Sequence, residues 1–129
     1  MGLAGCTDRA DVVATNYTKK LTIDMGSTAV ASTNDFTGGT GTTDVLKLTG
    51  TTHNLAGVTK IETIQASTNA ATTFTILNAN VDDGVSIHAD GSALTSTVFT
   101  VIASAEANGK VSITGGGGDD VITISQSDN

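Results

Sequence analysis

Two short apolar segments recur in this chain as a pair, and this recurrence limits the possible folds more than any other feature. Segment 74–77 (Phe-Thr-Ile-Leu) returns as 99–102 (Phe-Thr-Val-Ile), and segment 85–87 (Val-Ser-Ile) returns as 111–113 (Val-Ser-Ile), each after about 25 residues. Apolar and polar residues alternate in these segments, which predicts half-buried β-strands. A repeat of this length with two short strands has the size of one coil of a β-solenoid.

In a solenoid, similar residues of successive coils are buried against one another. We therefore expect Phe74 to lie over Phe99, and Val85 over Val111, in a parallel β-solenoid of the β-roll or β-helix kind with two short strands per coil. An antiparallel β-sandwich is the alternative, because closely spaced short strands with turn signals between them also suit that fold. The solenoid is favoured, since a sandwich does not require successive strand pairs to resemble each other.

The composition also indicates an all-β fold. The chain has 129 residues, 38% of them apolar but only 3% aromatic, so its core has to be built from Val, Ile, Leu and Ala in thin, regular layers. It contains 24 threonines, 15 glycines and no proline. Threonine favours strands, glycine favours turns, and the residue that interrupts β-ladders is absent.

The first part of the chain lacks the repeat. We divide the sequence into an N-terminal arm, residues 1–36, and a β-solenoid domain, residues 37–129. Residues 8–20 hold the only plausible helix, although their Val and Thr content also suits a strand. Residues 3–6 (Leu-Ala-Gly-Cys) match the lipobox of bacterial lipoproteins, but only two residues stand before Leu3, where basic and apolar regions are expected. Either the true start lies upstream or the match is chance, and chance is favoured. The single cysteine, Cys6, cannot form an internal disulfide.

A glycine-rich segment near the C-terminus leads directly into a strand. Residues 115–123 read Gly-Gly-Gly-Gly-Asp-Asp-Val-Ile-Thr. We expect the glycines to adopt positive φ in a tight turn, Asp120 to supply a hard oxygen ligand, and the strand to begin immediately after it. A looser copy at residues 38–46 has one residue more between its last glycine and Asp44. A flexible glycine linker is the alternative interpretation.

Residues 115–123 resemble the nonapeptide G-G-x-G-x-D-x-U-x of the calcium-binding RTX family at every defined position. The resemblance covers the two glycine segments, and more loosely the Thr/Gly/Asp-rich chain between them, which is similar to bacterial surface-layer proteins and large secreted adhesins. It implies a β-roll whose turns bind calcium, with Asp120 as side-chain ligand and backbone carbonyls from Gly116 and Gly118. This chain has one intact copy and one irregular copy, whereas RTX sites are completed by motifs on neighbouring turns.

Further carboxylates stand beside glycine, where turn formation or cation binding explains them more simply than acid-base catalysis. Together with the resemblance they make up the expected calcium ligands: Gly116, Gly118, Asp119, Asp120, Gly39, Gly41, Asp44, Asp82 and Asp83.

The charge pattern excludes several functions. The net charge is −7, with eleven Asp against two Glu, and the six basic residues form no stripe, so we expect no nucleic-acid partner. His53 and His88 have no partner at metal-ligand spacing, and we expect both at the surface. Nucleophile elbows, zinc-protease motifs and phosphate loops are missing from the sequence, so we expect no enzyme.

These observations favour a structural protein. We expect an extracellular or cell-surface β-solenoid that self-assembles into a homopolymeric layer or filament, with calcium fixing its turns and no transmembrane segment. The final coil begins at Ile122, which predicts an open edge at that end. One alternative is a module of a large secreted adhesin, with cell-surface polysaccharide as partner. Another is an ice-binding protein, based on Thr-x-Thr pairs at 73–75, 95–97 and 40–42, although these pairs do not recur at one fixed position in each repeat.

Overall fold

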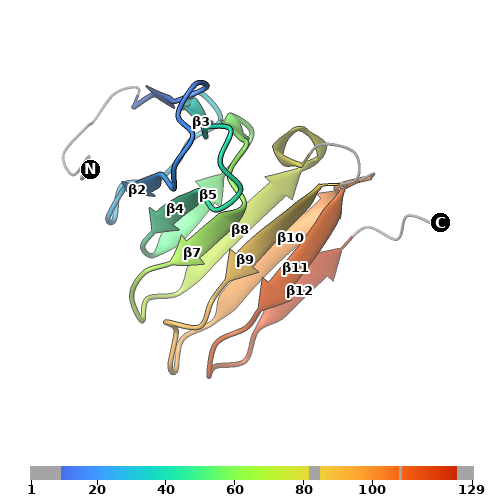
Figure 1. Ribbon diagram of the computed structural model, residues 1–129. Coiled ribbons are helices and arrows are strands. Elements are labelled where there is room, and N and C mark those ends of the chain that lie inside the picture. Colours follow the sequence, from blue (N-terminus) through green and yellow to red (C-terminus); the bar gives the residue numbers. More distant parts are fainter. Residues whose placement is uncertain (1–9, 82–84, 108, 125–129) are drawn as a thin grey trace.

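The protein is a parallel β-solenoid of about five turns in a computed structural model that describes residues 10–81, 85–107 and 109–124 (Figure 1). Every strand pair in the described part of the chain is parallel. The all-β, parallel solenoid architecture predicted from the repeat is therefore confirmed, and the antiparallel sandwich is not the fold.

Three sheets form the sides of the solenoid. The five-stranded sheet has the order β11-β9-β7-β4-β2, and its strands are β2 (Thr22–Asp24), β4 (Val45–Leu48), β7 (Thr63–Ala66), β9 (Ser86–Asp90) and β11 (Lys110–Thr114). The four-stranded sheet has the order β12-β10-β8-β5, with β5 (Thr51–Asn54), β8 (Thr72–Leu77), β10 (Phe99–Ala105) and β12 (Val121–Ile124). The three-stranded sheet joins β1 (Val12–Val13), β3 (Phe36–Thr37) and β6 (Val58–Thr59).

The three-stranded sheet forms a further side of the solenoid, which the sequence repeat does not predict. Its strands have two residues each, too few to display an alternating pattern. In the following coil this side holds the short 3-10 helix η1 (Asn78–Asn80). Asn80 lies inside the corner, where its side-chain amide donates to the carbonyl oxygens of Leu55 and Val58 in the preceding coil. The later coils therefore keep the two long strands that the repeat predicts.

The start of the chain belongs to the solenoid from the first described residues onward. Strand β1 pairs with β3, and β2 pairs with β4, so the described part of the expected N-terminal arm, residues 10–36, packs on the solenoid as its first coil and the start of its second. Within residues 10–20 the structure has strand β1 and turns but no helix. The remainder of the expected helix, and the 3–6 lipobox match with its Cys6, lie outside the described residues.

The register of the repeat differs from the expected one by two residues. Phe74 pairs with Val101, and Phe99 pairs with Thr72, instead of one phenylalanine lying directly over the other. In the five-stranded sheet Val111 pairs with Ile87, two residues beyond Val85. Because side chains alternate with a period of two, this shift leaves the same residues facing inward. The rings of Phe74 and Phe99 still meet edge to face, with centroids 5.2 Å apart.

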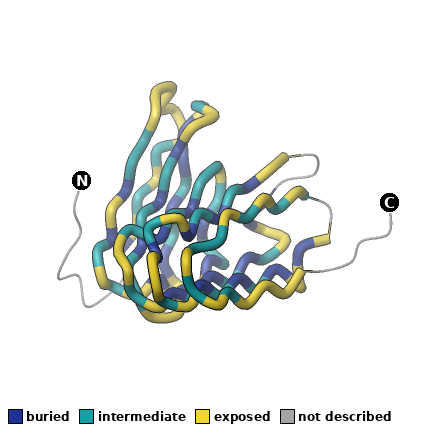
Figure 2. The backbone as a smooth tube through the Cα atoms, turned by 90° about the horizontal axis from the view of Figure 1, so that it is seen from below, coloured by how far each residue is buried: buried dark blue, intermediate teal, exposed yellow. Residues whose placement is uncertain are grey.

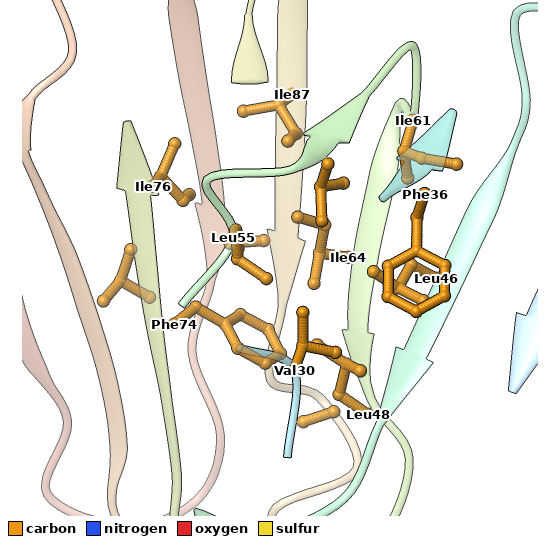
Figure 3. Packing of buried hydrophobic residues seen from close by; sticks show 14 of the residues in the cluster. Val30, Phe36, Leu46, Leu48, Leu55, Ile61, Ile64, Phe74, Ile76 and Ile87 are labelled. Atoms are coloured by element: carbon orange, nitrogen blue, oxygen red, sulfur yellow. The ribbon is translucent and has the colours of Figure 1, made fainter. Parts of the chain in front are cut away.

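The core is a column of inward-facing side chains between the sheets. Buried positions alternate with more exposed ones along the strands (Figure 2). The residues of β8 alternate between buried and intermediate along its whole length. The three phenylalanines Phe36, Phe74 and Phe99 are fully buried. Aliphatic side chains such as Leu46 and Ile64 lie in the same cluster as Phe36 and Phe74 (Figure 3). Stacking of these layers holds the sheets in place and fixes where the connecting loops lie.

Candidate functional site

The Asp120 carboxylate joins its own glycine loop to the preceding coil. Its Oδ2 accepts a hydrogen bond from the Gly116 amide at 2.8 Å, and its Oδ1 accepts one from the Phe99 amide at 3.1 Å. Phe99 is the first residue of β10, on which β12 stacks immediately after Asp120. One side chain therefore closes the loop and aligns the start of one strand with the start of the next.

Asp44 makes the same pair of contacts in the irregular copy of the motif. Its Oδ2 accepts from the Gly39 amide at 2.7 Å, and its Oδ1 accepts from the Leu21 amide, just before β2, at 2.8 Å. The Asp44 side chain is fully buried. The additional residue in this copy is accommodated within the loop, and the function of the aspartate is retained.

The glycines at 115–118 are needed for space rather than for positive φ. A Cβ on Gly116 would collide with the Leu94 carbonyl oxygen, and one on Gly118 with the Thr97 carbonyl oxygen, because the loop lies directly on the backbone of the coil below. The Gly117 amide donates to the Leu94 carbonyl at 2.6 Å. The expected positive φ is wrong for these residues, because among the described glycines only two have it, Gly26 and Gly50.

The first loop is enclosed from both sides in the same way. A Cβ on Gly38 would collide with the Lys60 carbonyl oxygen of the following coil, and one on Gly39 with the Tyr17 carbonyl oxygen of the preceding coil. Gly41 has more room, because its nearest neighbour would be the Lys19 carbonyl oxygen at 3.3 Å. Both glycine segments are therefore stacking loops, in which the missing side chain allows backbone to lie on backbone.

The described loops do not fit the calcium shell that the resemblance implies. Calcium takes six to eight oxygen ligands, yet both oxygens of Asp44 and of Asp120 already accept backbone amides. Asp44 precedes a strand of the five-stranded sheet and Asp120 a strand of the four-stranded sheet, so the two lie at different corners. Asp119 is exposed. No group of three or more acidic, His or Cys side chains able to hold a metal occurs among the described residues.

The remaining expected calcium ligands, Asp82 and Asp83, lie outside the described residues. Calcium binding there stays a prediction, which rests on the two adjacent carboxylates and the glycine that follows them.

Other polar side chains bridge neighbouring coils at the corners, and no motif in the sequence marks them. Glu62 Oε2 accepts from the Asp44 amide at 2.7 Å, which repeats one coil later the contact that Asp44 makes with Leu21. Asn69 Oδ1 accepts from the amides of Thr95 and Ser96 at 2.9 and 3.1 Å. The available signal was weak: Glu62 and Asp44 each stand one residue before a strand of the five-stranded sheet.

His53 is fully buried, so its expected position at the surface is wrong. Its Nδ1 accepts from the Val30 amide at 3.2 Å, and its Nε2 lies 2.6 Å from the Gly50 carbonyl oxygen, to which it donates in that tautomer. Its ring meets Phe74 edge to face at 6.0 Å. Burial lowers the pKa of His53, although the bond to Gly50 partly opposes this effect. The residue is a neutral core histidine that joins two coils. His88, by contrast, is only partly buried, on strand β9.

The last described coil exposes side chains that the inner coils bury. Ile122 pairs with Val101 and Ile124 with Ala103, both of which are buried, so the two isoleucines face the interior side of the sheet. Nevertheless Ile122 is 49% exposed and Ile124 is 58% exposed. Val111 and Ile113 on β11 are partly buried at the same end. We call these four residues the end face: Val111, Ile113, Ile122 and Ile124.

Comparison of the chain with protein-family models, with curated proteins and with solved structures finds no match. Across residues 10–81, 85–107 and 109–124, none of the helical structure is long and apolar enough to cross a bilayer. Function is therefore inferred from the geometry of the chain itself.

Proposed function

We propose that this protein is a structural subunit that self-assembles outside the cell, forming a layer or filament by stacking a second copy on its end face. The exposure of Ile122 and Ile124 on the interior side of β12 carries this proposal. In every inner coil the equivalent side chains are covered by the next coil, and an uncovered set of this kind is typical of an interaction surface.

A second copy fits this surface because it would repeat the contact that already holds the coils together. β11 and β12 are edge strands at one end of their sheets, and β2 is the edge strand at the other end of the five-stranded sheet. An edge strand offers unpaired backbone N–H and C=O groups, with which a parallel strand of another copy can pair. Stacking one copy's β2 on another copy's β11 would continue the parallel sheet, and repetition of this head-to-tail contact gives an open filament.

The two ends of the solenoid differ in how much apolar side-chain surface they expose. Ile23 and Met25, in the first coil, are buried within the chain, whereas Ile122 and Ile124 are half exposed. Most of the apolar surface would therefore come from the C-terminal coil. The acidic composition and the absence of a basic stripe are compatible with an extracellular location, which belongs to the same proposal.

Sedimentation velocity of two matched lysine variants tests this proposal. Ile122→Lys places a charge on the interior side of β12, and Thr123→Lys places the same charge on its outer side. A charge on the inward side of an edge strand blocks further pairing. We expect the unmodified chain and Thr123→Lys to form large species with rising concentration and Ile122→Lys to stay monomeric. An unmodified chain that is monomeric at every concentration would sink the proposal and favour an adhesin module.

A further inference from the structure

We propose that the outer face of the four-stranded sheet binds ice. This inference is independent of the self-assembly proposal, because it concerns the side of the solenoid and not its end. The surface, here called the threonine face, consists of two rows of outward-facing residues that are in register across β5, β8, β10 and β12: Thr52, Asn54, Thr73, Thr75, Thr100, Ile102, Val121 and Thr123.

The residues of the threonine face form two rows across the sheet, and the spacing of these residues in the sequence does not reveal the rows. Thr52 pairs with Thr73, Thr73 with Thr100, and Thr100 with Val121, which makes one row across the sheet. A second row, two residues further along each strand, contains Asn54, Thr75, Ile102 and Thr123. Unequal coil lengths hide these rows in the sequence. Of the Thr-x-Thr pairs, only 73–75 lies on this face, whereas 40–42 and 95–97 lie in loops, so the expectation that these pairs do not recur at one fixed position in each coil is confirmed.

The threonine face carries no charge, although the chain as a whole is strongly acidic. None of its eight residues is ionisable. On the five-stranded sheet, by contrast, Asp24 pairs with Lys47, and Asp90 lies further along the same row, where it accepts a hydrogen bond from Gln65 at 2.8 Å. The two long sides of the solenoid thus differ: one is neutral and the other is charged.

The hydroxyl groups of the threonine face are available to a ligand. In the described part of the chain, the hydroxyls of Thr73, Thr75 and Thr100 make no hydrogen bond to protein atoms, and neither do those of Thr52 and Thr123. Some threonines elsewhere are used internally, as where the hydroxyls of Thr37 and Thr59 lie 3.1 Å apart in the three-stranded sheet. The five threonine hydroxyls of the threonine face are not used in this way.

The spacing of these rows suits a flat, repeating, uncharged partner. Neighbouring strands lie about 4.8 Å apart, and residues two apart on a strand are separated by about 6.6 Å. Threonine is restricted at χ1, so its methyl and hydroxyl groups take few arrangements along a row. A protein partner would instead be expected to meet aromatic or arginine side chains, and this face has neither. An ice surface is flat, neutral and built only of hydrogen-bonding groups, and it needs no such anchors.

Matched lysine variants on the two long sides test the inference. Thr73→Lys and Thr100→Lys each interrupt the centre of the threonine face, whereas Thr63→Lys places the same charge at an outward position of β7 on the five-stranded sheet. The readouts are ice-recrystallisation inhibition and thermal hysteresis, with circular dichroism to confirm that each variant is folded. We expect activity in the unmodified chain and in Thr63→Lys, and its loss to the buffer baseline in Thr73→Lys and Thr100→Lys.

Three outcomes would overturn the inference: an unmodified chain with no effect on ice, equal activity in all the folded variants, or retention on insoluble polysaccharide without any effect on ice. The assays are repeated with Ile122→Lys, which removes the proposed end contact. Activity that survives in this variant would show that ice binding does not need assembly, so the two proposals can fail separately.

Discussion

At the scale of single residues, the glycines and polar side chains of the loops serve the stacking of coils. Asp44 and Asp120 each use both carboxylate oxygens to hold two amides in place. Hydrogen bonds from backbone amides to a carboxylate are stronger than those between neutral groups. The motif that resembles a calcium loop can therefore be explained by the need to align one strand start over another.

His53 makes stability depend on pH. Because burial lowers its pKa below the ordinary value of 6.5, His53 contributes stability that is fully present above about pH 6.5 and is lost as the pH falls below it. We expect the free energy of unfolding to decline by up to about 1.4 kcal/mol per pH unit in that range from this residue alone. Chemical denaturation at about pH 7.5 and 5.5, compared with His53→Gln, measures this. An equal acid-induced loss in both chains would contradict the assignment.

At the scale of elements, the sequence predicts the two-residue alternation along the strands but not the register in which the strands pair. Alternating Val, Ile and Phe identified most of the long strands and the faces they bury. Coil length varies, however: Val45 pairs with Thr63, whereas Thr72 pairs with Phe99. The loops absorb these differences through contacts such as that of Asn69 with the Thr95 amide, which depend on the position of another coil and leave no local signal.

Because the loops stack backbone on backbone, we expect the loss of unfolding free energy caused by a glycine substitution to depend on the space around that glycine. Gly116→Ala would force a methyl group onto the Leu94 carbonyl oxygen, so we expect a loss of about 1–3 kcal/mol in unfolding free energy, as is typical of overpacking. Gly41→Ala is the control, because its nearest neighbour would lie at 3.3 Å. We expect a change within about 1 kcal/mol there, since alanine also restricts the unfolded chain. Thermal or urea unfolding compares the two variants, and equal losses would contradict the stacking explanation.

At the scale of the whole molecule, the described solenoid has one neutral side, one charged side and one end at which Ile122 and Ile124 are about half exposed. The repeat in the sequence was sufficient to predict the parallel solenoid, because it reports which segments lie over one another. The burial of His53 and the alignment of the threonine face could not be predicted, since both arise from residues that come together only when unequal coils are stacked.

Calcium separates the two explanations of the glycine loops. The RTX resemblance predicts that calcium raises the melting temperature, because a ligand at 100 times its Kd adds about 2.7 kcal/mol to stability. The amide-bonded carboxylates of Asp44 and Asp120 predict that their own loops contribute no such rise. We therefore expect any rise with calcium to come from the Asp82 and Asp83 pair and to disappear in Asp82→Asn and Asp83→Asn variants. A saturable rise that persists in both variants would contradict this explanation of the two loops.

In the proposed assembly, the end face of one copy stacks on another copy. Electron microscopy of the purified chain, with millimolar calcium and again with excess chelator, is the decisive measurement of this contact. We predict filaments or sheets in both conditions, and their absence for Ile122→Lys, because the contact depends on apolar side chains and strand edges. Dispersed single particles of the unmodified chain in both conditions would contradict the claim.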